Sequence, residues 1–122
     1  MATISGDGVV RLSGSAALQL FAIGSSNVGA TGTITVSADT GAVSLPLTLT
    51  ACETDSAGNC VASPSPAVTV TYAGATNKSF KFFAQASGAI AFSPAVNRVF
   101  VRLRSSDGVQ RGATSAAVCT GC

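Results

Sequence analysis

Residues 98–118, RVFVRLRSSDGVQRGATSAAV, constrain the fold more than any other stretch of the chain. Val99, Val101 and Leu103 alternate with the arginines at 98, 102 and 104 and with Phe100. One face of an extended segment can therefore enter a core while the other meets water. An Asp107-Gly108 pair follows, and Asp-Gly between two such segments is typical of a type I′ hairpin turn, in which both central residues have positive φ. The stretch therefore predicts two antiparallel strands that close an all-β fold.

A strict two-residue turn at this position creates a difficulty of register. It would place Arg104 directly opposite Arg111, and like charges in directly opposed positions destabilise a strand pair. We therefore expect a longer loop or a β-bulge beside the turn.

The same period of two recurs along most of the chain. Pro46 lies within one predicted strand, and because proline cannot donate a ladder hydrogen bond, this strand is predicted to lie at a sheet edge or to carry a bulge. Gly, Asn, Asp and Pro separate the segments, and this spacing predicts a two-sheet sandwich of about seven to eight antiparallel strands. The predicted strands before the last hairpin are residues 17–23, 33–39, 43–51, 68–72 and 79–85, with a short run at 90–92.

Length and composition narrow the class of protein. The 122 residues predict one domain. Hydrophobic residues make up 47% and charged residues only 10%, yet no apolar stretch approaches the roughly 18 residues that a membrane span needs. The net charge of +2 is too small and too scattered to predict binding to nucleic acid.

The residues that usually carry enzyme chemistry are scarce. Histidine, the commonest general base and metal ligand, is absent, and the five acidic residues are dispersed among predicted turns. Tryptophan is absent and there is a single tyrosine, so flat aromatic platforms for carbohydrate are not expected. We expect a protein that is not an enzyme, with no catalytic residues, no metal site and no cofactor.

Four cysteines, Cys52, Cys60, Cys119 and Cys122, are disulfide candidates. Cys52 falls on the outward face of its predicted strand, where a bond to Cys60 would close the ETDSAGN loop and stabilise the fold by about 2–3 kcal/mol. A four-cysteine zinc site is the alternative, but the seven residues between Cys52 and Cys60 exceed the usual zinc-knuckle spacing. The terminal CTGC motif is compatible with a disulfide, with a link to a neighbouring chain or with redox chemistry, although no helix follows it. Residues 55–59 carry too few oxygen ligands for a calcium loop.

Paired cysteines and few charges are typical of an oxidising compartment, so we expect an extracellular or cell-surface protein. The chain starts MATISGDG, which has neither the basic start nor the apolar stretch of an export signal. Either an export signal was removed and Met1 was added for expression, or the protein is cytosolic, and we favour the first of these.

The order of the predicted strands, the long last hairpin ending in TSAAV and the VSLPLTLTAC segment resemble the immunoglobulin-like or fibronectin-type-III-like repeats of bacterial secreted and cell-surface proteins. The resemblance covers residues 17–119, so that residues 1–16 would be a linker or an edge or donor strand, and residues 120–122 a tail. It implies a spacer, adhesion or assembly module. The chain departs from antibody domains, because it has no tryptophan for the core and its cysteines are not placed to bridge two sheets.

Two surfaces are candidates for contact with a partner. A basic strip with an aromatic residue can bind an anionic polymer, although arginines on a strand face also prevent edge pairing. The outward Phe83, on a different predicted strand, is expected to join Phe100 in an exposed apolar patch. The strip that shares one strand face with Phe100 consists of Arg98, Arg102 and Arg104.

We expect a non-catalytic structural or interaction module, such as a spacer or adhesion domain of a bacterial surface protein, whose partner is another protein or a second copy. The alternative is a self-assembling, pilus-like filament subunit that donates an N-terminal strand to the open edge of a neighbour. The candidate donor residues are Val9, Val10, Arg11 and Leu12.

Overall fold

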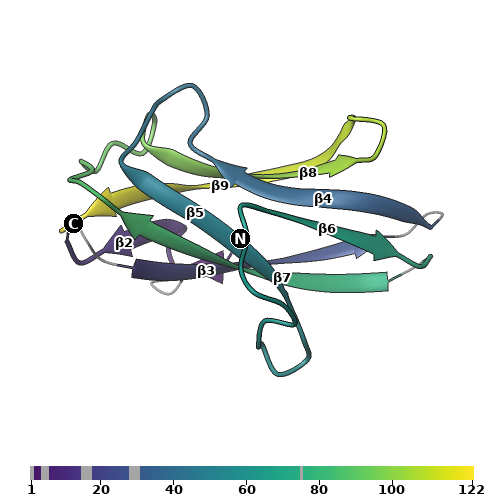
Figure 1. The fold of residues 1–122 in the computed structure, drawn as a ribbon. Coiled ribbons are helices and arrows are strands. Elements are labelled where there is room, and N and C mark those ends of the chain that lie inside the picture. Colours follow the sequence, from purple (N-terminus) through teal and green to yellow (C-terminus); the bar gives the residue numbers. More distant parts are fainter. Residues whose placement is uncertain (1, 4–5, 15–17, 28–30, 75) are drawn as a thin grey trace.

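The computed structural model describes residues 2–3, 6–14, 18–27, 31–74 and 76–122. These residues form two β-sheets that face each other as two layers (Figure 1). No helix among them is long and apolar enough to cross a membrane. The strands in this part of the chain are β1 (Ala2–Thr3), β2 (Val9–Leu12), β3 (Leu18–Asn27), β4 (Gly32–Asp39), β5 (Leu47–Thr54), β6 (Ala67–Tyr72), β7 (Thr76–Ala86), β8 (Arg98–Ser105) and β9 (Gln110–Thr120).

Sheet A has the strand order β1-β3-β7-β5, and sheet B has the order β2-β9-β8-β4-β6. The predicted all-β architecture of two sheets is therefore confirmed. The expectation that all strands are antiparallel is wrong for β2, which pairs with β9 in parallel. The two strands come from opposite ends of the chain, so no hairpin connection forces them to run in opposite directions.

The core lies between the sheets and is built from alternate side chains of their strands. Phe80, Phe82 and Ala84 of β7 are fully buried, and Val99 and Val101 of β8 are also fully buried. The period-two pattern therefore correctly identified the inward faces of these two strands. The same holds for the inward rows of β4 and β6, which consist of Ile34, Val36, Ala38, Val68, Val70 and Tyr72.

Several strands differ from the predicted ones, and β7, for example, begins at Thr76 and not at residue 79. The predicted strand at 17–23 ends too early, because β3 continues as far as Asn27 and each of its added residues pairs with β7. β5 begins only after Pro46, and it lies at the edge of sheet A, as predicted from this proline. The run at 90–92 is not a strand, and Phe92 is 53% exposed.

The turn between β8 and β9 has three loop residues instead of two. The Gly108 N–H donates to the Ser105 carbonyl at 2.9 Å, and the Ser105 N–H donates to the Val109 carbonyl at 2.9 Å. A type I′ turn at Asp107-Gly108 needs positive φ at both residues. Gly108 has a φ of 83°, but in the described part of the chain only glycines have positive φ, so Asp107 does not and the predicted type I′ turn is wrong. This is the loop in which a left-handed glycine follows a tight turn and forms a G1 bulge.

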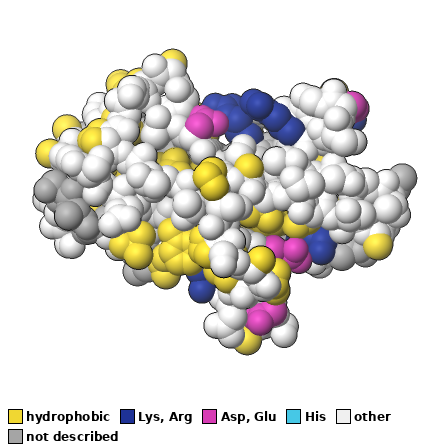
Figure 2. Space-filling view, viewed as in Figure 1, with side chains coloured by type: hydrophobic (Ala, Val, Ile, Leu, Met, Phe, Trp, Pro, Cys, Tyr) yellow, Lys and Arg dark blue, Asp and Glu magenta, His cyan; other side chains and the backbone are white. Residues whose placement is uncertain are grey.

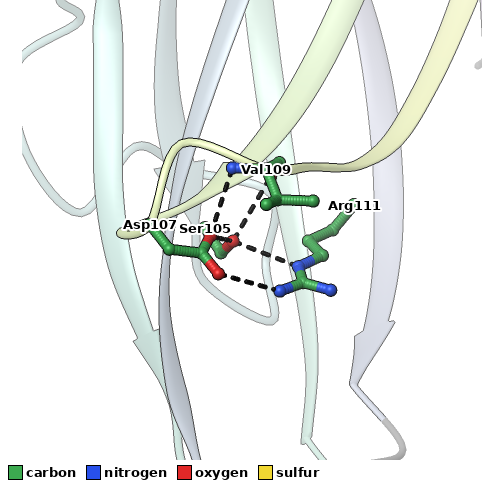
Figure 3. A network of polar contacts seen from close by, with 4 residues as sticks. All are labelled: Ser105, Asp107, Val109 and Arg111. Carbon is green, nitrogen blue, oxygen red and sulfur yellow. Dashed lines mark hydrogen bonds and ion pairs between the residues drawn. The ribbon is translucent and has the colours of Figure 1, made fainter.

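The bulge expected beside this turn is confirmed. Leu103 pairs with Gly112 and Arg104 pairs with Gln110, so Arg111 is the additional residue and does not face Arg104. Figure 3 shows that Arg111 instead turns to the loop, where its guanidinium lies 3.1 Å from the Asp107 carboxylate. Hydrogen bonds from the Ser105 hydroxyl and the Val109 N–H hold the pKa of Asp107 below its ordinary value. The loop therefore relieves the repulsion that a two-residue turn would create.

The free edge of β5 is covered by the loop that follows it, residues 55–65. Ala51 and Ser65 exchange two backbone hydrogen bonds of 2.8 and 2.9 Å. Cys60 of this loop is bonded to Cys52, with 5.5 Å between their Cα atoms. Cys52 points away from the core as predicted from its position, yet it is only 2% exposed because the loop covers it. An edge covered in this way is protected from pairing with another chain.

Candidate partner-binding surface

The outer face of sheet B carries the arginines that the sequence placed on one side of their strand. They alternate along β8 with the buried Val99 and Val101. In register beside them lie Thr35, Ser37 and Asp39 of β4. We call the outward-facing residues of β8, which are Arg98, Phe100, Arg102 and Arg104, the basic strip.

Arg102 is the member of the basic strip that has an acidic partner. Its Nε donates to Asp39 Oδ2 at 2.7 Å and its Nη2 donates to Oδ1 at 3.2 Å, so two parallel bonds join the guanidinium to the carboxylate. The guanidinium also lies 5.2 Å from the centre of the Phe100 ring. The hydrogen bond from Arg102 lowers the pKa of Asp39, and partial burial of the carboxyl opposes this effect.

The Asp39–Arg102 pair predicts a specific response to acid. The pKa of Asp39 is lower in the folded chain than in the unfolded chain. The ionised carboxylate therefore stabilises the fold fully above the ordinary carboxyl pKa of about 4, and this contribution is lost as the pH falls through the lowered pKa. Asp39→Asn is therefore expected to reduce the fall in thermal unfolding midpoint between about pH 5 and about pH 2. Arg102→Gln should flatten the same curve, since it removes the partner. Unchanged curves for both variants would contradict this assignment.

The other two arginines of the basic strip form no ion pair with the described residues, although the charge of Arg104 helps to lower the pKa of Asp39. Arg98 donates to the Ser115 hydroxyl at 3.2 Å and to the Pro94 carbonyl at 2.7 Å, and both of these acceptors are neutral. Arg104 is exposed and makes no hydrogen bond or ion pair with the described residues. Neither guanidinium group is therefore neutralised by a direct ion pair with the described residues.

Most cations elsewhere in the chain are neutralised locally. Ion pairs of 2.8, 3.2 and 3.1 Å join Arg11 to Asp7, Lys78 to Glu53 and Arg111 to Asp107. Lys81 lies on the outer face of sheet A, beside Cys52 in the register. The excess of basic over acidic residues is thus concentrated on the basic strip. In Figure 2, Lys and Arg side chains gather on one side of the molecule with an acidic side chain next to them.

Phe100 is held in place by the loop after β4. Gly41 has a φ of 69°, and a Cβ atom on this residue would lie 2.9 Å from Phe100 Cε2. Gly41→Ala is therefore expected to destabilise the fold by about 1–3 kcal/mol, through left-handed strain and contact with the ring. Urea unfolding measures this cost, and the open position Gly14→Ala, which has no atom within 4 Å of the added Cβ, is the control. Equal free energies for wild type and Gly41→Ala would show that the ring is not fixed by this loop.

Phe83 does not join Phe100, and that expectation is wrong. Phe83 lies on the outer face of sheet A, between Leu20 of β3 and Thr50 of β5. Phe100 lies on the outer face of sheet B. The outer faces of two stacked sheets point in opposite directions, so the two rings belong to opposite sides of the sandwich.

The candidate donor strand Val9–Leu12 is β2 of the chain's own sheet B. Val10 and Leu12 are 1% and 2% exposed and belong to the core. The Gly121 N–H donates to the Leu12 carbonyl at 2.7 Å. This strand therefore completes the edge of the sheet beside β9 within the same chain.

The two terminal cysteines form a second disulfide, Cys119–Cys122, with 6.1 Å between their Cα atoms. Cys119 is fully buried, whereas Cys122 is exposed. All four cysteines are thus paired as two local bridges, a pattern typical of an oxidising environment. Among the residues that the structure describes, no three His, Cys, Asp or Glu side chains are grouped as metal ligands would be.

Asp39 and Gly41 were not recognised from the sequence as parts of this surface. The alternation of Thr35, Ser37 and Asp39 was a usable signal, because it places the carboxylate outward on its strand. What the sequence did not show is that β4 pairs with β8. That pairing brings Asp39 to Arg102 and the loop with Gly41 to Phe100.

No protein-family model matches the chain, and no curated protein is significantly similar to it. The chemistry of the basic strip is therefore interpreted from its geometry. Guanidinium groups bind carboxylates through two parallel hydrogen bonds, and the neighbouring Ser37 hydroxyl adds a neutral donor. The surface can thus bind an acidic partner.

Proposed function

We propose that the chain is a non-catalytic structural or interaction module of an extracellular bacterial surface protein, acting as a spacer or adhesion domain. Two local disulfides and the covered edge of β5 support an exported, rigid scaffold. The observation that carries the proposal is the positive charge of Arg98 and Arg104, which lie on the outer face of sheet B and form no ion pair in the described part of the chain. Such a face fits an acidic protein surface.

An immunoglobulin-like architecture is part of this proposal, and the spatial order of the strands supports it. Immunoglobulin domains have sheets ordered A-B-E-D and G-F-C, the latter extended by C′ in variable domains. The orders β1-β3-β7-β5 and β9-β8-β4-β6 correspond to these arrangements strand by strand. The path of the chain departs from them between β4 and β7, because the chain visits β5, in the D position, before β6, in the C′ position.

Beads coated with the purified, oxidised chain test this function. Coated beads are expected to attach to bacterial cells or to one another, and attachment should fall at least about tenfold when Arg98 and Arg104 are both changed to glutamate, because like charges at an interface cost several kcal/mol. Arg11→Glu is the control, since it changes a cation of sheet B that already pairs with Asp7. Wild-type beads that attach no better than beads coated with an inert protein would contradict the proposal.

A second candidate function is a filament subunit that assembles with copies of itself. The observation that favours it is that one chain carries both an acidic and a basic side chain that form no ion pair. Asp55 is the only acidic side chain without an ion pair among the described residues, while Arg104 is a cation without one. Because β2 already completes its own sheet, we propose contact between charged surfaces as the route of assembly, in place of strand donation.

A further inference from the structure

The loop that carries Asp55 is a rigid projection from one side of the sandwich. Asp55 Oδ1 accepts hydrogen bonds from the N–H groups of Ala57 and Asn59 at 2.9 and 3.0 Å, which fixes the turn. The Cys52–Cys60 disulfide and the backbone bond from Val61 to Glu53 hold the base of the loop. In Figure 1 this loop, between β5 and β6, extends away from both sheets. We call residues 53–61 the acidic knob.

The basic strip lies in a hollow on the opposite side of the molecule. In Figure 1 the loop after β4 rises on one side of β8, and the tip of the β8–β9 hairpin rises on the other. In the same view, Figure 2 shows Lys and Arg side chains at the bottom of the depression between these two projections. Arg104 is exposed on the outer face of sheet B, so a projection of a partner can reach its guanidinium.

We propose that a second copy of the chain is the occupant, with its acidic knob seated on the basic strip and its Asp55 carboxylate bound by Arg104. This inference rests on the second proposed function, self-assembly. The free oxygen of Asp55, Oδ2, accepts no hydrogen bond from the described residues, so the carboxylate can bind a guanidinium without leaving its own turn. Glu53 is already paired with Lys78 at 3.2 Å, which leaves Asp55 as the charged end of the knob.

The location of the two surfaces determines the kind of assembly. The knob and the hollow are different patches on opposite sides of one molecule (Figure 1), so each copy can bind one neighbour through its knob and another through its strip. Contacts of this head-to-tail type form rings when the rotation closes and open filaments when it does not. The opposite directions of the two patches favour an open chain.

Sedimentation velocity of the purified, oxidised chain tests this contact. Wild type is expected to associate with increasing concentration, and the association should weaken as salt rises from about 0.05 M to about 1 M. Arg104→Glu and Asp55→Lys should each weaken association at least about tenfold, because each places like charges at the contact. Asp55→Asn removes only the charge and keeps the acceptor of the turn, so it should weaken association without altering the loop.

Mixing the two charge-reversed variants is the decisive step. In an equimolar mixture of Arg104→Glu and Asp55→Lys, every contact between unlike variants again joins opposite charges, so association should return to within about threefold of wild type. The double variant should also assemble alone. Arg11→Glu, which makes the same change in net charge at the edge strand β2, should behave as wild type.

The outcomes separate this contact from the proposed function of self-assembly. A wild-type chain that stays monomeric up to about millimolar concentration contradicts both. Association that is equally strong in Arg104→Glu, Asp55→Asn and wild type leaves self-assembly standing and overturns the knob-to-strip contact. Variants that fail to associate alone and fail to recover when mixed, although their circular dichroism spectra are native, also overturn it.

Discussion

Phe82→Ala is expected to lower the free energy of unfolding by about 3–5 kcal/mol, a larger loss of stability than we expect for the other substitutions proposed for this chain. Phe82 is fully buried, and its ring stacks on that of Phe21 with 5.0 Å between centroids and 5° between planes. In the register it lies between Phe21 of β3 and Ala51 of β5, in the middle of sheet A. Truncation therefore leaves a cavity that neither neighbouring strand can fill without moving.

The adjacent residue supplies the control for this prediction. Phe83 is half-buried on the outer face of the same strand, so Phe83→Ala is expected to cost no more than about 1 kcal/mol. Urea unfolding followed by circular dichroism measures both variants. Similar losses for the two phenylalanines would contradict the assignment of opposite faces and, with it, the layered packing of sheet A.

The alternation of side chains was sufficient to predict which residues of β4, β6, β7 and β8 face the core. Along β7 and β8, every second residue from Phe80 to Ala84 and from Val99 to Val101 is buried. This succeeds because a strand that packs on one face must place its side chains with a period of two, whichever strands lie beside it. The effect of Pro46 was also predictable, since a missing N–H restricts a strand to an edge.

The alternation of side chains does not show which strands lie side by side in a sheet. Phe83 and Phe100 both point outward, but β7 belongs to sheet A and β8 to sheet B, so their rings are on opposite sides. Asp39 contacts Arg102 although 63 residues separate them. Pairings of this kind depend on the path of the whole chain, which local periodicity does not encode. The same reason explains why the parallel position of β2 beside β9 was missed.

Replacing Cys52 and Cys60 together by alanine is expected to have the second largest effect, a loss of about 2–3 kcal/mol. The bond joins residues eight apart, and without it the unfolded chain gains the entropy of an open loop. The loop also covers the free edge of β5 through the two hydrogen bonds between Ala51 and Ser65. We therefore expect the variant to aggregate faster as well, because a loosened loop exposes unpaired backbone groups.

The Cys119–Cys122 disulfide provides a comparison that distinguishes the loss of stability from the faster aggregation. Cys119–Cys122 joins residues only three apart, so the same entropy argument gives a smaller loss, about 2 kcal/mol, when both are replaced by alanine. It lies at the end of β9, where it closes no loop over a sheet edge. Chemical unfolding should show a larger loss of stability for the Cys52 and Cys60 variant than for the Cys119 and Cys122 variant. Light scattering should show faster aggregation for the Cys52 and Cys60 variant alone. Equal aggregation of both would mean that the loop at residues 55–65 does not protect β5, and that the disulfides act on stability only.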